Sequence, residues 1–332
     1  MIDTTNPEIN FALQAIRQAS LLIKRIQNEL VSPVLVKADR SSVTVADFAS
    51  QAVVGGLISL NFPSDVLVAE ENSHILRLPQ NHTILDLVTR FVLKNFPNAS
   101  PEKICNWIDR GNGVPQGRFW VLDPLDGTKG FLRGGQYAVA LALLENDQVQ
   151  ISALGCPKMT DGFREDYKGP GSLVIAVRNQ GTWTTPLEGA ESFIQLSVAK
   201  CNHPSQARML RSFEADHTNA SQIDRLVKIM EIQAAPVLMD SQAKYALLAA
   251  GGGELVLRML STENKDYREK IWDQAPGSLI VEEAGGCVTD LDGNPLDFSQ
   301  GRALNRHRGI LASNRFLHTL TLDALKEITS HA

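Results

Sequence analysis

Apolar side chains recur along this chain in two patterns, at steps of three and four or in short continuous runs. These patterns predict where the helices and strands lie. Over residues 8–30 the apolar side chains fall at steps of three and four, which predicts an amphipathic helix that ends before Pro33. Shorter apolar runs predict buried strands, and two of these runs, residues 66–69 and 119–122, lead directly into acidic residues. Carboxylates are therefore expected at the ends of strands.

The rest of the first half predicts a mixture of helices and hairpins. The segment 43–45 is expected to end a strand, and an apolar helix is expected from Asp47 towards Phe62. Paired apolar runs over residues 137–154 and 172–185 predict two β-hairpins. Residues 72–117 are less regular, with a helix expected over 84–96 and a loop over 97–117.

After about residue 190 the expected strands and helices alternate, which is typical of an α/β domain. Strands are expected at 207–213, 236–239, 254–259, 287–290 and 309–312, and helices at 220–232, 241–250, 274–284 and 315–329. We therefore expect two domains, an α+β domain over residues 1–190 and an α/β domain over residues 191–332.

Composition narrows the function. The 332 residues carry a formal net charge of −5 without a Lys/Arg-rich block, which argues against a nucleic-acid partner, including an exonuclease substrate. No apolar run approaches the roughly 18–20 residues of a membrane span, and the N-terminus does not resemble a secretory signal. The scattered cysteines suit a reducing compartment, so we expect a cytoplasmic protein. They are Cys105, Cys156, Cys201 and Cys287.

Five carboxylates stand at the ends of expected elements. They are Asp47, Glu70, Asp123, Asp126 and Asp273. Several carboxylates brought together from different elements are the oxygen ligands that Mg²⁺ prefers. Taken singly, Asp47 and Asp273 are equally compatible with helix N-caps.

The segment from Asp123 to Thr128 is the densest part of this set. Pro124 stiffens the turn, Gly127 permits an unusual backbone angle, and the N–H groups of Gly127 and Thr128 could face an anion. By its local pattern alone, the same segment is also compatible with an ordinary surface turn.

Longer motifs resemble the inositol monophosphatase superfamily. Residues 120–128 (WVLDPLDGT) are similar to the first signature of that superfamily, and residues 271–277 (IWDQAPG) with 283–286 (EAGG) to the second. The likeness extends to residues 39–47 and 69–71 but leaves 72–117 unmatched, and Ala69 stands where many members have glycine.

Within the superfamily, the chain more closely resembles the 3′(2′),5′-bisphosphate nucleotidases. Residues 127–138 (GTKGFLRGGQYA), 213–217 (FEADH), 240–245 (DSQAKY) and 270–273 (KIWD) are similar to theirs. The resemblance implies a layered αβαβα sandwich. It also implies two or three Mg²⁺ ions, held by Glu70, Asp123, Asp126, Asp273 and the carbonyl of Leu125.

The resemblance also implies how water and substrate are held. Asp47 and Thr128 would position and deprotonate the attacking water. The sugar, second phosphate and base of the nucleotide would contact His217, Ser241, Lys244 and Arg258, with Lys244 and Arg258 as the cations for the 5′-phosphate.

The implied reaction is hydrolysis of 3′-phosphoadenosine 5′-phosphate to AMP and phosphate, with 3′-phosphoadenosine 5′-phosphosulfate as a second substrate. The alternatives are an inositol polyphosphate 1-phosphatase or inositol monophosphatase, and a silent binding protein for phosphorylated nucleotides. The resemblance further implies inhibition by lithium and a place in sulfur assimilation, and we expect a monomer.

Overall fold

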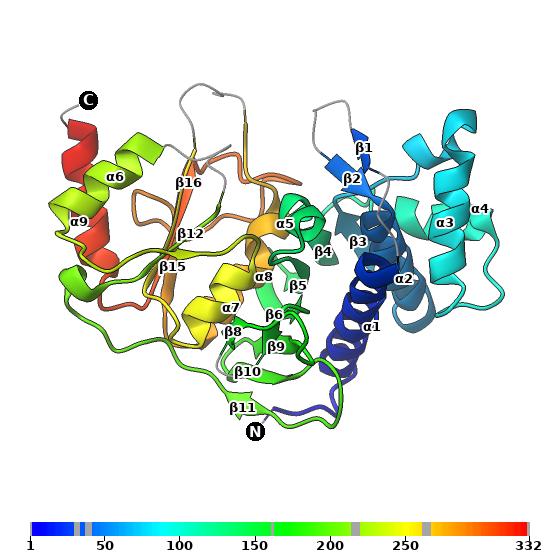
Figure 1. Cartoon of the computed structure of the whole chain (residues 1–332), viewed down its shortest axis with the longest axis horizontal. Coiled ribbons are helices and arrows are strands. Elements are labelled where there is room, and N and C mark those ends of the chain that lie inside the picture. The colour runs from blue at the N-terminus through cyan, green and yellow to red at the C-terminus, as the bar shows by residue number, and fades with distance from the viewer. Residues whose placement is uncertain are drawn as a thin grey trace.

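A computed structural model describes residues 2–29, 34–36, 42–160, 163–213, 220–260 and 267–330. Its two main β-sheets are separated and flanked by three layers of helices (Figure 1). Among these residues, no helix combines the length and the apolar character that crossing a membrane requires.

The first sheet has seven strands in the order β11-β10-β9-β6-β5-β4-β3. Its strands are β3 (Val66–Ala69), β4 (Arg118–Asp126), β5 (Ala138–Glu145), β6 (Gln148–Cys156), β9 (Ser172–Val177), β10 (Gly181–Pro186) and β11 (Ile194–Gln195). β3 and β4 are parallel, and the other neighbours are antiparallel. Both predicted hairpins are confirmed, as β5–β6 and β9–β10. Asn146, Asp147 and Asn179 adopt the positive φ angles that such tight turns use.

Both faces of this sheet are buried. In β4, Trp120 and Leu122 join the core that contains α1 (Pro7–Glu29) and α2 (Val45–Asn61), whereas Phe119 and Val121 join the core on the opposite face. This two-sided burial explains why the strand reads as a continuous apolar run in the sequence.

The middle layer consists of α7 (Ala243–Ala249) and α8 (Ile271–Glu283), which share a core with both sheets. Where α8 meets β5, the strand presents Ala138, Ala140 and Ala142, and these small side chains let the helix approach closely. α8 therefore lies near the ends of the strands that carry the acidic residues.

The second sheet has five strands in the order β13-β12-β14-β16-β15. They are β12 (Met209–Arg211), β13 (Val237–Leu238), β14 (Leu255–Met259), β15 (Cys287–Thr289) and β16 (Gly309–Ser313). Its outer face packs on α6 (Ala220–Ile229) and α9 (His318–Ser330). The succession helix, sheet, helix, sheet, helix confirms the expected αβαβα sandwich.

Smaller elements complete the chain. They are β1 (Val34–Val36), β2 (Ser42–Thr44), η1 (Ile75–Arg77), η2 (Pro79–Asn81), α3 (His82–Val92), α4 (Pro101–Asp109), α5 (Thr128–Arg133), β7 (Met159–Thr160), β8 (Arg164–Glu165) and η4 (Pro204–Gln206).

Two local predictions need correction. The loop expected over 97–117 contains α4, which Ser100 caps by accepting a hydrogen bond from the N–H of Lys103. Val45, expected at a strand end, begins α2 because Thr44 caps that helix and its side chain accepts from the N–H of Ala46.

Candidate active site

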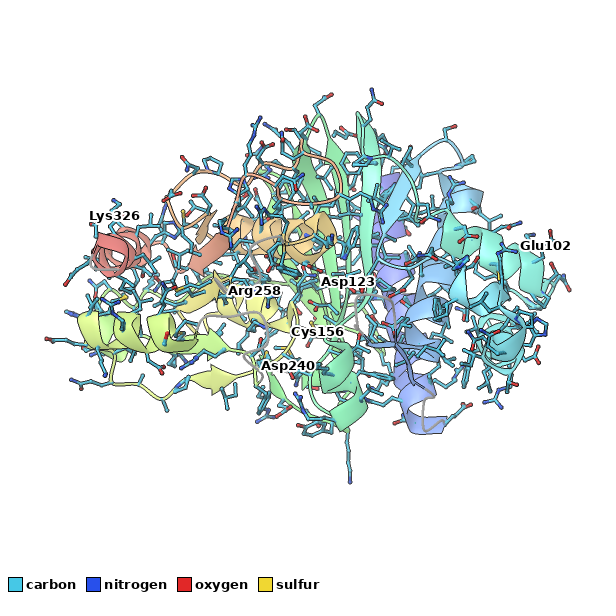
Figure 2. The ribbon with its side chains drawn as sticks, turned by 90° about the horizontal axis from the view of Figure 1, so that it is seen from above. Glu102, Asp123, Cys156, Asp240, Arg258 and Lys326 are labelled. Atoms are coloured by element: carbon cyan, nitrogen blue, oxygen red, sulfur yellow. The ribbon has the colours of Figure 1, made fainter. Side chains whose placement is uncertain are left out.

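A pocket of about 290 Å³ opens between the two sheets. In Figure 2, Asp123 and Arg258 lie in the middle of the molecule, where the two sheets approach each other. Most of the predicted site residues line this pocket. They are Glu70, Asp123, Leu125, Asp126, Gly127 and Thr128 from the first half and Ser241, Lys244, Arg258 and Asp273 from the second.

The end of β4 shapes one wall of the pocket. The register of β4 against β5 shifts between Asp123 and Asp126, so the strand bulges, and the N–H of Leu125 donates to Asp123 Oδ1 at 3.1 Å. Gly127 follows with a φ of +84°. A Cβ atom there would lie 2.9 Å from Ser241 Cβ, so both the backbone angle and the close packing favour glycine.

Asp47 does not itself line the pocket but contacts Thr128, which does. Thr128 Oγ1 lies 3.3 Å from Asp47 Oδ1 and 3.3 Å from the carbonyl oxygen of Leu125. The other oxygen of Asp47 accepts hydrogen bonds from the N–H and the hydroxyl of Thr44. Asp47 is almost fully buried, so its direction towards Thr128 is fixed by the start of α2.

Asp273 reaches the pocket in a similar way. Asp47 and Asp273 are not the N-cap residues of their helices, which are Thr44 and Lys270. Asp273 Oδ2 accepts from the N–H of Lys270, which ties the carboxylate to the start of α8. Glu70 directly follows β3. Carboxylates from two strands and one helix thus share the pocket.

Charge repulsion and burial act together on these acids. Burial raises the pKa of Asp123 well above its ordinary value, and Glu70, Asp126 and Asp273 raise it further by repulsion. Burial and the neighbouring Glu269 likewise raise the pKa of Asp273. The pKa of Asp126 is also raised by burial, although nearby Lys244 opposes the shift.

Clustered carboxylates that repel one another are a set of donors suited to a divalent cation. Within the described ranges, no group of three or more Asp, Glu, His or Cys side chains is arranged so that it could hold a metal ion. The donors nevertheless fit Mg²⁺ by chemical type, since carboxylate oxygens and a backbone carbonyl are hard ligands that line one pocket.

The turn before α7 packs against the end of β4 and contributes the adjoining wall. Ser241 adopts a φ of +67°, and the next N–H, that of Gln242, donates to Asp126 Oδ2 at 2.6 Å. The side chain of Gln242 donates to the carbonyl of Trp272 and accepts from the N–H of Gly277. One residue therefore joins Asp126 in the first half to α8 in the second.

Two cations also line the pocket, Lys244 from α7 and Arg258 from β14. Burial lowers the pKa of Lys244 to about 8, and its Nζ donates to Ser212 Oγ at 3.0 Å. Arg258 donates from Nε to Glu269 Oε1 at 2.7 Å. Burial acts to lower the pKa of Arg258, but Glu269, Tyr267 and Asp273 together raise it. The pocket thus contains both carboxylates and cations.

The sequence did not identify Glu269 or Gln242 as functional. Glu269 is almost fully buried, and its second oxygen accepts from Gln274 Nε2 at 2.9 Å, so it orients Arg258. Gln242 lies within the 240–245 motif and Glu269 directly precedes the 270–273 motif, but nothing in the local pattern indicates their partners. The predicted contact residue His217 lies outside the described residues.

Comparison with known sequences gives one family over nearly the whole chain. Residues 5–330 match the model of the inositol monophosphatase family. The chain is 40% identical to a 3′(2′),5′-bisphosphate nucleotidase of Oryza sativa, with 96% of this chain and 94% of that protein covered. It is 37% identical to the enzyme of that name from Schizosaccharomyces pombe, with coverages of 97% and 96%.

Comparison with solved structures gives the same fold. An inositol monophosphatase from Anabaena (Nostoc) matches with a TM-score of 0.65 at 20% identity, covering 98% of this chain and 97% of that one. An IMPase of Thermotoga maritima matches with a TM-score of 0.67 at 18% identity, and each chain is 98% covered. At these identities the likeness concerns the fold alone.

Proposed function

Because the chain belongs to the inositol monophosphatase family and, within it, to the 3′(2′),5′-bisphosphate nucleotidases, we propose that it removes the 3′-phosphate of 3′-phosphoadenosine 5′-phosphate, giving AMP and phosphate. The sulfated analogue, 3′-phosphoadenosine 5′-phosphosulfate, is the proposed second substrate. An inositol phosphatase activity is the alternative that the experiment below decides.

The observation that carries this proposal is that one pocket holds both carboxylates and cations. Glu70, Asp123 and Asp273 line it together with Lys244 and Arg258. A substrate with two phosphates suits this arrangement, since the scissile phosphate needs metal ions and the distal phosphate needs fixed cations.

Enzymes of this family depend on metal ions. Here Mg²⁺ would be held by the carboxylates of Glu70, Asp123 and Asp126 with the Leu125 carbonyl, and a second ion by Asp123, Asp126 and Asp273. Bound Mg²⁺ supplies positive charge that neutralises the phosphoryl oxygens and makes water more acidic.

The pair Asp47–Thr128 would handle the attacking water. Thr128 Oγ1 can accept a hydrogen bond from water while it donates its own hydrogen to Asp47 Oδ1, 3.3 Å away. Asp47 is then the final acceptor of the proton, and its other oxygen stays bonded to Thr44. The N–H groups of Gly127 and Thr128 are the proposed donors to the phosphate.

Phosphate release over a substrate panel tests the proposal. The panel contains 3′-phosphoadenosine 5′-phosphate, its sulfated form, adenosine 3′-monophosphate and inositol mono- and bisphosphates, each with Mg²⁺. We expect the highest kcat/KM with the adenosine bisphosphate. A preference for an inositol phosphate would overturn the proposal.

A Lys244→Met variant sharpens the test. It should lower kcat/KM for the adenosine bisphosphate by roughly 10- to 100-fold, since a charge-assisted contact with the distal phosphate is lost. Hydrolysis of adenosine 3′-monophosphate, which lacks that phosphate, should change little. Equal losses on both substrates would contradict the assignment of Lys244 to the 5′-phosphate.

Further parts of the proposal concern inhibition and setting. Lithium is proposed to inhibit by replacing a Mg²⁺ ion, and a rate unaffected by rising lithium would contradict this.

We propose a cytoplasmic monomer in sulfur assimilation. All four cysteines are free thiols, which suits a reducing compartment. Light scattering would test the monomer.

A further inference from the structure

Arg302, which no motif singled out, connects the two halves of the molecule. Its Nη1 donates to the carbonyl oxygens of Gly111 at 2.9 Å and Gly113 at 3.2 Å, and its Nη2 donates to that of Ala69 at 2.5 Å. Its guanidinium also lies over the ring of Trp272, 4.9 Å from the centroid. Two of these neighbours, Ala69 and Trp272, directly precede Glu70 and Asp273.

The carbonyls that Arg302 binds belong to a rigid edge of the first sheet. The N–H of Ala69 donates to Gly111, and the N–H of Gly113 donates to Leu67, so the 111–113 segment is paired with β3. A Cβ atom on Gly113 would lie 2.4 Å from the carbonyl oxygen of Leu67, which shows how closely the two segments pack. Arg302 therefore fixes the end of β3, where Glu70 emerges.

The backbone around Arg302 is attached to the start of α8. The N–H of Ile271 donates to the carbonyl of Arg302 at 3.2 Å, and the N–H of Leu304 donates to that of Glu269 at 2.9 Å. Lys270 and Ala303 form a β-bridge between these contacts. The backbone of Arg302 is thus attached to the segment that leads into Asp273, while its side chain is attached to the segment that leads into Glu70.

We propose that Arg302 is a positioning residue, which sets the distance between Glu70 and Asp273 and thereby the affinity of the pocket for Mg²⁺. The inference rests on the proposed metal ligands. It concerns the geometry of the site, since Arg302 donates its hydrogen bonds to backbone carbonyls and leaves the carboxylates to other partners.

An arginine suits this task better than a lysine. The planar guanidinium presents several N–H groups in fixed directions and offers a flat face to Trp272, so it can hold three carbonyls and an aromatic ring at once. A lysine ammonium keeps the charge but cannot reproduce that set of directions.

When Arg302 is removed, the loss of its charge and the loss of its positioning contacts should change the affinity for Mg²⁺ in opposite directions. A positive charge near a cation site repels the cation, so loss of the charge alone would strengthen Mg²⁺ binding. Loss of positioning would weaken it, and removing groups that orient metal ligands typically costs 10- to 100-fold in affinity.

Calorimetric titration of Mg²⁺ into the full-length protein without substrate tests the inference. Arg302→Ala should raise the dissociation constant of Mg²⁺ by about tenfold or more. Arg302→Lys should show most of that loss. If Arg302→Ala does not fold, Arg302→Lys and Arg302→Gln carry the test.

Arg110→Ala is the matched control. Arg110 also donates to backbone carbonyls, those of Phe62, Pro63 and Asp65, but these precede β3 and lie at its other end. This variant should lose thermal stability as Arg302→Ala does, while its Mg²⁺ affinity stays within about twofold of the wild type.

Unchanged or tighter Mg²⁺ binding by Arg302→Ala would overturn the inference, as would wild-type affinity in Arg302→Lys. An equal loss of Mg²⁺ affinity in Arg110→Ala would also overturn it, because Arg302 would then act only through the general stability of the fold. Uptake of Mg²⁺ that survives Asp123→Asn in the otherwise wild-type chain would instead refute the proposed metal site.

Discussion

Removing the hydroxyl of Thr128, which lines the pocket, gives the sharpest test of the proposed chemistry. Thr128→Val keeps the branched shape of the side chain and deletes the oxygen that lies 3.3 Å from Asp47 Oδ1. The proposed proton path from water to Asp47 is then broken. The carboxylates that line the pocket are left in place.

The expected cost falls on turnover. General acid–base groups contribute about 10²- to 10⁴-fold, so kcat should fall by that factor, or roughly 2.7–5.4 kcal/mol of activation free energy. Stability should change far less. Asp47 keeps its bonds to the N–H and hydroxyl of Thr44, at 2.8 and 2.7 Å, and a lost hydrogen bond costs about 1 kcal/mol.

Steady-state phosphate release at saturating Mg²⁺ measures kcat and KM separately, and calorimetry reports Mg²⁺ affinity and melting temperature. Thr128→Ser is the control, because it keeps the hydroxyl and should retain kcat within about tenfold. The reasoning fails if Thr128→Val turns over at a rate near that of Thr128→Ser. It also fails if the loss appears in Mg²⁺ affinity.

Three further predictions concern the charges around the pocket. Asp123→Asn should abolish turnover in Mg²⁺ and cancel the rise in melting temperature that Mg²⁺ gives the wild type; surviving activity would exclude Asp123 as a ligand. A chelator should lower the melting temperature more at about pH 8 than at about pH 5.5. Burial and neighbouring acids raise the pKa values of Asp123 and Asp273, so the metal-free fold is favoured at low pH and loses that advantage as pH rises through the raised values. Equal shifts at both pH values would contradict this. The kcat/KM for the adenosine bisphosphate, divided by that for adenosine 3′-monophosphate, should fall above the pKa of Lys244, which burial lowers to about 8. Lys244→Arg should remove the fall, and a ratio independent of pH would refute the role of Lys244.

The sequence predicted the long elements well because their patterns are strong. α1 and the four strands of the two hairpins follow from periodicity and turn residues alone. α4 was missed because Pro97 and the glycines around 111–117 suggested a loop, although Ser100 followed by Pro101 is a typical helix start. α5, bounded by Gly127 and Gly134, is too short for any periodicity to show.

The site was predicted by a different route. Asp47 and Thr128 are 81 positions apart, and no local pattern pairs them; only the family resemblance did so. Glu269 and Arg302 were missed because the family resemblance assigned them no role. Their importance lies in what they touch across the fold, and a single sequence carries no record of such contacts.

The small-residue face of β5 has a consequence for biosynthesis. A ribosome finishes the first sheet, through β11, before it has made α8 (Ile271–Glu283), which covers that face in the finished protein. The nascent chain therefore presents an uncovered apolar surface, already carrying Glu70 and Asp123 but still without Asp273. Such an intermediate is a natural client for chaperones. The proposed metal site is therefore complete only once α8 has docked.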